Sequence, residues 1–412
     1  MIIRQATSGD ADGIAALLSK SFLEDTAVIR VSIENNPRYS ISNMYVLEDK
    51  SLFPGIAGCL RITPFEVFSR GVKMPMAGIA AVAVQPNLRK RGIADALMND
   101  ALRRMYEMEY PVSMLFPFRH SFYKRFGYGY VGNVVQYRVS PGNLSTFPER
   151  VNVRGINKTD RPKLKRMLLE DLVVHGAFTP VRNDSFWELV VFPKLKDTYV
   201  YDDGETKGYI AFDLSKDLTV GNETSGQSVL NIREFVALDE AAHRGLWGFV
   251  GALADQVTVA KYLAPADYPL HLFLKEPREF SFERLFFEYK TLSTLASGFM
   301  LRVVDVMKSL VMLGQSVETQ MDVSLRINDG NLPQNSRAFN LHLHKGEATI
   351  DETKLAPQFE TDIEIFSQIY SGLLKPSDAM KYGFAVSDER TARKLDDVFL
   401  APAPFVHQFD IF

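Results

Sequence analysis

The sequence GIAAVAVQPNLRKRGIADALMNDALRRM occupies residues 78–105 and has three parts: an apolar run, a basic turn and a segment with periodic apolar residues. Its apolar part, residues 79–84, ends before Pro86 and is typical of a buried strand. After a basic turn at residues 89–92, apolar side chains recur every four residues, which is the spacing of one helical face. They are Ile93, Leu97, Ala101 and Met105. This pattern predicts a strand, a basic turn that contains a glycine, and a helix.

The turn places Arg89, Lys90 and Arg91 directly before Gly92. The first turn of a helix has N–H groups without intrahelical acceptors and carries the positive end of the helix dipole. An anionic group such as a pyrophosphate is stabilised there. A solvated charged turn at a helix start has the same sequence, so the turn alone leaves both interpretations open.

Length and charge limit the class of protein. The chain has 412 residues, too many for one ordinary core, and we expect two or three domains. Its net charge of −3 argues against broad binding to nucleic acid or to anionic membranes. No apolar run approaches the ~20 residues of a membrane helix, and residues 1–30 do not have the pattern of a signal peptide. We therefore expect a soluble, cytoplasmic protein.

Two features that often carry chemistry are discounted. The single cysteine, Cys59, lies in an apolar stretch, so we expect a small buried side chain rather than a nucleophile or a zinc ligand. His342 and His344 share one strand face, which is the geometry of a metal pair, but no third ligand is evident in the sequence. We expect a surface strand face there and no metal site.

The chain divides into three parts. A turn at Pro141–Asn143 and a change in the sequence pattern near Leu292 predict domains over residues 1–145, 146–291 and 292–412. The first part alternates strands and helices, which favours a βαβ-type core with mixed strands. The third predicts strands over residues 301–306, 321–327, 338–343 and 347–350, and helices over residues 362–374 and 387–398.

The middle part repeats the layout of the stretch at residues 78–105. Strand-like residues 233–238 lead into a turn and a helix that begins near Asp239. The phosphate turn is not repeated well, because Ala242 occupies the position of Arg89. We interpret this unit as a duplicated fold without the ligand.

A second informative segment is YKRFGY at residues 123–128. Together with the strand, the helix and the pattern Arg89-x-x-Gly92-x-Ala94, it resembles the GNAT acyltransferase superfamily, whose turn R/Q-x-x-G-x-G/A holds the pyrophosphate of acetyl-CoA. The resemblance extends to one branch, the enhanced-intracellular-survival (Eis) aminoglycoside acetyltransferases. That branch shares the YKRFGY-like segment, a degenerate second unit and an aromatic last residue, here Phe412.

The resemblance implies an α/β (α+β) fold, with tandem GNAT-like acyltransferase domains followed by a sterol-carrier-protein-like domain. It also implies a homohexamer, acetyl-CoA as co-substrate and no metal. The implied activity is direct acetyl transfer, in a ternary complex, to an amine acceptor. That acceptor would be an aminoglycoside, a polyamine or a lysine-like amine.

The resemblance also assigns the co-substrate site residue by residue. Strand backbone would bind the pantetheine arm, through Val82, Ala83 and Val84. The turn and the helix start would bind the pyrophosphate, through Arg89, Lys90, Arg91, Gly92, Ile93, Ala94 and Asp95. Phe118 and Arg119 would lie near the co-substrate.

For the chemical step, the resemblance implies that Tyr123 is the general acid and that the terminal carboxylate of Phe412 is the general base. A phenol with a pKa of about 10 would protonate a thiolate of pKa about 8.5 at a cost of only ~2 kcal/mol. The carboxylate, with a pKa near ~3.5, is a poor base unless burial raises its pKa or a water relays the proton. It would equally attract a cationic amine. Glu24 and Asp25 would attract the substrate too, or form a solvated helix end.

Other interpretations remain open at this point. Tyr123 would otherwise be a core aromatic, and Phe412 a hydrophobic plug that anchors the tail and also positions the carboxylate. The alternative functions are a non-catalytic CoA-binding scaffold and a lipid carrier that acts through the third domain.

Overall fold

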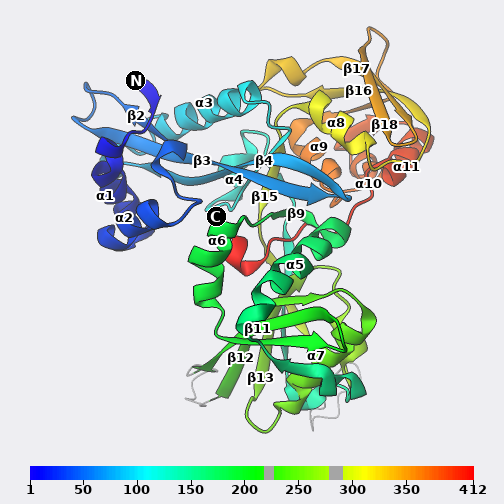
Figure 1. The fold of residues 1–412 in the computed structure, drawn as a ribbon. Coiled ribbons are helices and arrows are strands. Elements are labelled where there is room, and N and C mark those ends of the chain that lie inside the picture. The colour runs from blue at the N-terminus through cyan, green and yellow to red at the C-terminus, as the bar shows by residue number, and fades with distance from the viewer. Residues whose placement is uncertain (218–226, 278–290) are drawn as a thin grey trace.

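The computed structural model describes residues 1–217, 227–277 and 291–412. Across these residues the strands form three sheets. Figure 1 shows one unit around each sheet, with the middle unit below the other two and the chain end where the three meet. The expected mixed α/β architecture is confirmed.

The first sheet has the order β1-β2-β3-β4-β5-β15-β6, and β9 pairs with β3. Its strands are β1 (Ile2–Gln5), β2 (Met44–Glu48), β3 (Ile56–Ser69), β4 (Val72–Val84), β5 (Val112–Leu115), β6 (Gly129–Tyr130), β9 (Ala177–Pro180) and β15 (Met300–Val303). The helices of this unit are α1 (Ala11–Phe22), α2 (Thr26–Asn35), α3 (Ile93–Glu107) and α4 (His120–Lys124).

The predicted strand, turn and helix are β4, its following turn and α3. The side chains of the predicted helical face, from Ile93 to Met105, are at most 1% exposed and belong to the core above the sheet. Burial of this face holds α3 on the sheet, as in most amphipathic helices of globular proteins. The short connection then places the start of α3 beside the end of β4.

The second sheet has the order β14-β7-β13-β12-β11-β10-β8. Its strands are β7 (Asn133–Val139), β8 (Val153–Gly155), β10 (Asp197–Asp202), β11 (Thr206–Asp217), β12 (Gln227–Ala237), β13 (Val259–Pro265) and β14 (Ser293–Ser297), and its helices are α5 (Arg161–His175), α6 (Asp184–Phe186) and α7 (Glu240–Ala252). The parallel pair β12 and β13 is joined through α7, as the parallel pair β4 and β5 is joined through α3. The predicted repeat of the layout is therefore confirmed.

The third sheet has the order β18-β17-β16-β19-β20. Its strands are β16 (Met321–Asn328), β17 (Ala338–His344), β18 (Glu347–Glu352), β19 (Phe359–Asp362) and β20 (Ala385–Ser387), and its helices are α8 (Val306–Gly314), α9 (Ile363–Tyr370), α10 (Pro376–Lys381) and α11 (Glu389–Val398).

One strand of the third part ends earlier than expected. The prediction of a strand over residues 301–306 is wrong at its end, because α8 begins at Val306. The Asp305 carboxylate accepts the backbone N–H of Lys308 at 3.0 Å, which caps the new helix.

The sheets exchange strands across the expected domain limits. β7 precedes residue 145 but lies in the second sheet, and β15 follows residue 292 but pairs with β5 in the first. β9, from the middle of the chain, pairs with β3. These crossings bring the three units together around one place, where the chain also ends. No helix in the described part of the chain is long and apolar enough to cross a membrane.

Candidate active site

The basic turn leaves the start of α3 open. Gly92 is the N-cap of α3 with a φ of 77°, and no side chain accepts the first N–H groups of the helix. A Cβ at this position would meet no atom within 4 Å, so the space in front of these groups is free. Arg89, Lys90 and Arg91 are exposed around it. Such a turn fits a diphosphate, through backbone N–H groups and three cationic side chains.

The neighbouring strand has a free edge. β4 pairs with β5 only from Met76 to Ile79. Within the described residues, residues 80–84 continue without a partner strand on that side, while β3 pairs with them on the other. Backbone N–H and C=O groups at a free edge need partners, and the amides of a pantetheine arm match them. Val82, Ala83 and Val84 therefore fit the predicted role.

A cavity of about 470 Å³ lies at this edge, between β4, α2 and the chain end. It brings together five of the predicted site residues, which come from distant parts of the sequence: Glu24, Val82, Phe118, Tyr123 and Phe412. The lining residues that were not predicted include Phe22, Tyr39 and Arg61. The side chain of Phe22, at the end of α1, is 55% exposed and forms part of the cavity wall.

Tyr123 is both a core aromatic and a cavity residue. It is 3% exposed, and the rings of Phe118 and Phe122 lie 5.3 and 5.0 Å from its own. Burial, with a smaller contribution from Tyr128, raises the pKa of the Tyr123 phenol well above its usual value. The phenol is therefore neutral and retains a proton that it can donate. Its higher pKa also makes that donation costlier than the ~2 kcal/mol of an unperturbed phenol.

The ring of Phe412 is held among other rings. It lies 4.7 Å from Phe65 and 5.6 Å from Phe299. A Cβ on Gly78 would stand 2.7 Å from the Phe412 ring, so only a glycine leaves room for it. The expected hydrophobic plug is thus present, and it directs the end of the chain to the cavity.

A buried ion network fixes the tail just before Phe412. The Asp410 carboxylate accepts from Arg182 Nε at 3.0 Å and from Arg38 Nη2 at 2.9 Å. Arg182 also pairs with Glu234, which accepts from the Tyr209 hydroxyl at 2.8 Å. Burial alone would raise the pKa of Asp410, but the two guanidinium groups bring it below its ordinary value. Sequence reasoning missed this network, because its bonded members are 25 to 372 residues apart and share no local motif.

Several predicted residues lie outside the cavity lining, among them Asp25 and Arg119. Asp25 caps α2, where its carboxylate accepts the backbone N–H of Ala27 at 2.6 Å. Arg119 is the N-cap of α4, and its side chain is exposed. Of the two acidic residues that were expected to attract the substrate, the structure brings only Glu24 to the cavity.

Cys59 and His342 lie in the surroundings that the sequence predicts, the first in the core and the second on a strand face. Cys59 is fully buried, and burial raises the pKa of its thiol to about 12, so it is no nucleophile. Nδ1 of His342 lies 2.6 Å from Asp322 on an exposed strand face. No group of three metal-ligating side chains occurs in the described part of the chain.

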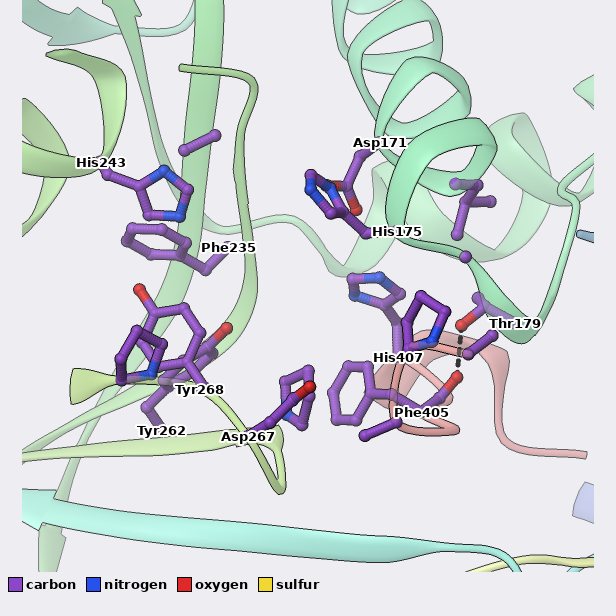
Figure 2. Close-up of a pocket in the computed structure, with 18 residues that line it drawn as sticks. Asp171, His175, Thr179, Phe235, His243, Tyr262, Asp267, Tyr268, Phe405 and His407 are labelled. Carbon is purple, nitrogen blue, oxygen red and sulfur yellow. Dashed lines mark hydrogen bonds and ion pairs between the residues drawn. The ribbon is translucent and has the colours of Figure 1, made fainter. Parts of the chain in front are cut away.

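The second unit has a smaller cavity, of about 320 Å³ (Figure 2). It is lined by residues of α5, β9, β12, α7, β13 and the tail, whereas the first is lined by residues of α1, α2, β3, β4, α4 and the chain end. Figure 2 shows Phe405 and His407 of the tail facing it. At the start of α7, however, the Asp239 carboxylate accepts the N–H of Ala242 at 2.8 Å. A negative cap therefore occupies the place that Gly92 leaves open in the first unit.

Comparisons with known proteins agree with this architecture. Models of the acetyltransferase (GNAT) domain match residues 2–131 and 179–303, and a model of the sterol carrier protein domain matches residues 306–407. N-acetyltransferase Eis of Mycobacterium tuberculosis is 22% identical over 351 residues, which cover 82% of this chain and 81% of that protein.

Two solved structures have the same fold over essentially the whole chain. A GCN5-related N-acetyltransferase from Anabaena variabilis has a TM-score of 0.83 at 20% identity, with both chains fully covered. Eis1 from Mycobacterium abscessus has a TM-score of 0.75 at 17% identity, with 99% of each chain covered.

Proposed function

This chain is an Eis-like N-acetyltransferase with two GNAT domains and a sterol carrier protein domain, and we propose that it acetylates a primary amine at the 470 Å³ cavity of the first unit. One observation carries the proposal: Tyr123, the end of the chain and the open edge of β4 meet in that cavity. A proton donor, a carboxylate and a co-substrate groove are the parts that acetyl transfer to an amine requires.

Acetyl-CoA is the implied co-substrate, and the residues present fit it. Its diphosphate suits the open start of α3, from Gly92 to Asp95, with the Arg89, Lys90 and Arg91 side chains around it. Its pantetheine arm suits residues 82–84 at the free edge of β4. We propose one such site per chain, because the Asp239 cap repels a diphosphate at the matching position of the second unit.

We assign the steps of transfer as follows. The amine nitrogen forms a bond with the acetyl carbon while the bond from that carbon to sulfur breaks, in a ternary complex without a covalent enzyme intermediate. Tyr123 donates a proton to the leaving sulfur. The amine loses its proton to the Phe412 carboxylate, directly or through water, and the same carboxylate attracts the cationic form of the amine.

The direct test is release of CoA from acetyl-CoA with a panel of amines: an aminoglycoside, a polyamine, lysine and simple alkylamines. We expect CoA release that depends on the amine. A protein that binds CoA but releases none with any amine would instead be the non-catalytic scaffold.

The lipid-carrier alternative has less support. The interior of the third unit is filled by side chains that belong to one core shared with the first unit, among them Leu310, Phe339, Phe366 and Leu395. The third unit contributes only residues of its tail, from Pro402 to Phe412, to the two cavities described above. A lipid that co-purifies with the protein would revive that alternative.

We also propose the finer features that the family resemblance implies. They are a cytoplasmic location, a homohexamer, and domains over residues 1–145, 146–291 and 292–412, between which strands are exchanged. Light scattering on the purified chain would measure its assembly, and a mass other than six chains would contradict the hexamer.

A further inference from the structure

Arg61 of β3 lies in the wall of the 470 Å³ cavity of the first unit, which we call the acceptor cavity. It is only 6% exposed. Its Nε donates to Thr63 Oγ1 at 3.1 Å, and its guanidinium carbon lies 4.1 Å from the centre of the Tyr39 ring. No carboxylate forms an ion pair with Arg61 within the described residues.

This makes Arg61 an exception in its own molecule. Four arginines are buried in the described part of the chain, and the other three each have an aspartate partner. Arg38 and Arg182 pair with Asp410, and Arg302 pairs with Asp329 at 2.6 Å. A buried guanidinium stays charged, and it is costly without a counter-charge. Because Arg61 borders a cavity, a ligand can provide that counter-charge.

The other charges of the cavity have the opposite sign. Glu24 and Phe412, whose carboxylate ends the chain, are among its lining residues. These carboxylates would stabilise an ammonium group, and Arg61 would stabilise an anion. Aromatic side chains, among them Phe22 and Phe118, supply the apolar wall. A polyamine would place a second positive charge near Arg61, which is unfavourable.

We propose that the acceptor of this enzyme is an amine that also carries a carboxylate, and that Arg61 binds the carboxylate. The planar guanidinium fork matches a carboxylate with two parallel hydrogen bonds. The inference rests on the proposed acetyl transfer and narrows its substrate class from any amine to amino acids and related amino carboxylates.

Matched acceptor pairs test it. We would measure kcat/KM by CoA release for phenylalanine against phenethylamine, and for 6-aminohexanoate against hexylamine. The two pairs differ in the separation between amine and carboxylate. In at least one pair we expect the carboxylate member to be ~10-fold better or more, since a hydrogen-bonded charge contributes about that much.

Variants of Arg61 assign the preference to this residue. Arg61→Met should abolish the preference, because it should lower kcat/KM for the carboxylate member ~10-fold more than kcat/KM for the plain amine. Arg61→Lys should keep part of the preference. The thermal transition of Arg61→Met and its binding of acetyl-CoA show whether this variant folds. If it does not fold, the carboxylate preference of the wild type and its change in Arg61→Lys still test the inference.

Three outcomes overturn the inference, and they are distinguishable. Transfer to amines without any carboxylate preference refutes the inference and leaves the proposed function standing. An equal loss for both members of a pair in Arg61→Met shows that Arg61 serves the chain end or the fold. No CoA release with any acceptor refutes the proposed function, and the inference with it.

Discussion

At the scale of single residues, Tyr123 and Phe412 reach one cavity for different physical reasons. Tyr123 is held by the aromatic cluster at the start of α4, whose burial also raises the pKa of its phenol. Phe412 is held by the rings of Phe65 and Phe299 and by the missing side chain of Gly78. The YKRFGY segment and the aromatic last residue are visible in the sequence. The space that joins them is not, because it depends on a glycine more than 300 residues before the end.

Replacement of Tyr123 by phenylalanine tests the general acid. We expect kcat to fall ~100-fold or more, since general acid catalysis contributes at least that much. Acetyl-CoA affinity should be unchanged, because only a hydroxyl is removed. Tyr128→Phe is the matched control: its hydroxyl lies 2.7 Å from Ser113 Oγ in the interior, so its loss should lower the melting temperature and spare kcat. A Tyr123→Phe enzyme within threefold of wild type would end the assignment.

Gly78→Ala tests whether acetyl transfer depends on the position of the Phe412 ring against Gly78. The new methyl group would stand 2.4 Å from Phe65 and 2.7 Å from Phe412, so the chain end must shift. Displacement of a catalytic group by about 1 Å costs up to ~100-fold, and we expect kcat to fall ~10-fold or more with little change in acetyl-CoA binding. Gly155→Ala, with no atom within 4 Å of the added carbon, is the control and should be neutral. Full activity of Gly78→Ala would remove the chain end from the mechanism.

At the scale of elements, two helices of similar layout begin in chemically opposite ways. α3 begins at a glycine with basic neighbours, and α7 begins at Asp239, whose carboxylate is hydrogen-bonded to the first turn. The sequence predicts both helices and the loss of the phosphate turn in the second. The sequence does not reveal that a capping aspartate occupies the start of the second helix. A cap can be recognised only when the first residue of the helix is known, and sequence patterns do not fix helix ends that closely.

Gly92→Asp should convert the first helix start into a copy of the second. Gly92→Asn is the matched control, since both side chains carry the same strain at a φ of 77° and differ by one charge. We expect the aspartate to weaken CoA binding ~10-fold more than the asparagine, and less at high salt. Calorimetric titration with CoA at two ionic strengths measures both effects. Equal affinities of the two variants would place the diphosphate elsewhere.

At the scale of the whole molecule, the tail connects all three units. After the third unit, its backbone bonds to β9 through Phe405 and Ala177, its Asp410 bonds to Arg38 and Arg182, and its last ring enters the first unit. Pro402, Ala403, Phe405 and His407 line the second cavity (Figure 2). Ile411 and Phe412 line the first. The strand exchange between the sheets stabilises the same meeting point.

Asp410→Asn should loosen this connection. Breaking a buried ion pair leaves uncompensated charge and costs about 3–5 kcal/mol, so we expect a lower melting temperature together with a lower kcat. The pKa of Asp410 is depressed in the folded chain. Its contribution is therefore present above the unfolded pKa of about 3.9, and it is lost as the pH falls through the folded value. Asp203→Asn, which breaks an exposed pair with Lys207, should change neither quantity measurably. A stable, fully active Asp410→Asn enzyme would contradict this account of the tail.

By itself, the sequence determined the parts that depend on neighbouring residues: β4, the basic turn, α3, the repeated layout and a buried, unreactive Cys59. Periodicity and turn chemistry act over a few residues, so they can be recognised along the chain. The tertiary structure alone decided which of these parts form a site. It brought Glu24 to the cavity and left Asp25 as a helix cap, and it buried Arg61 without an acidic partner. Such choices follow from packing between segments that are far apart in the chain, and no local pattern encodes them.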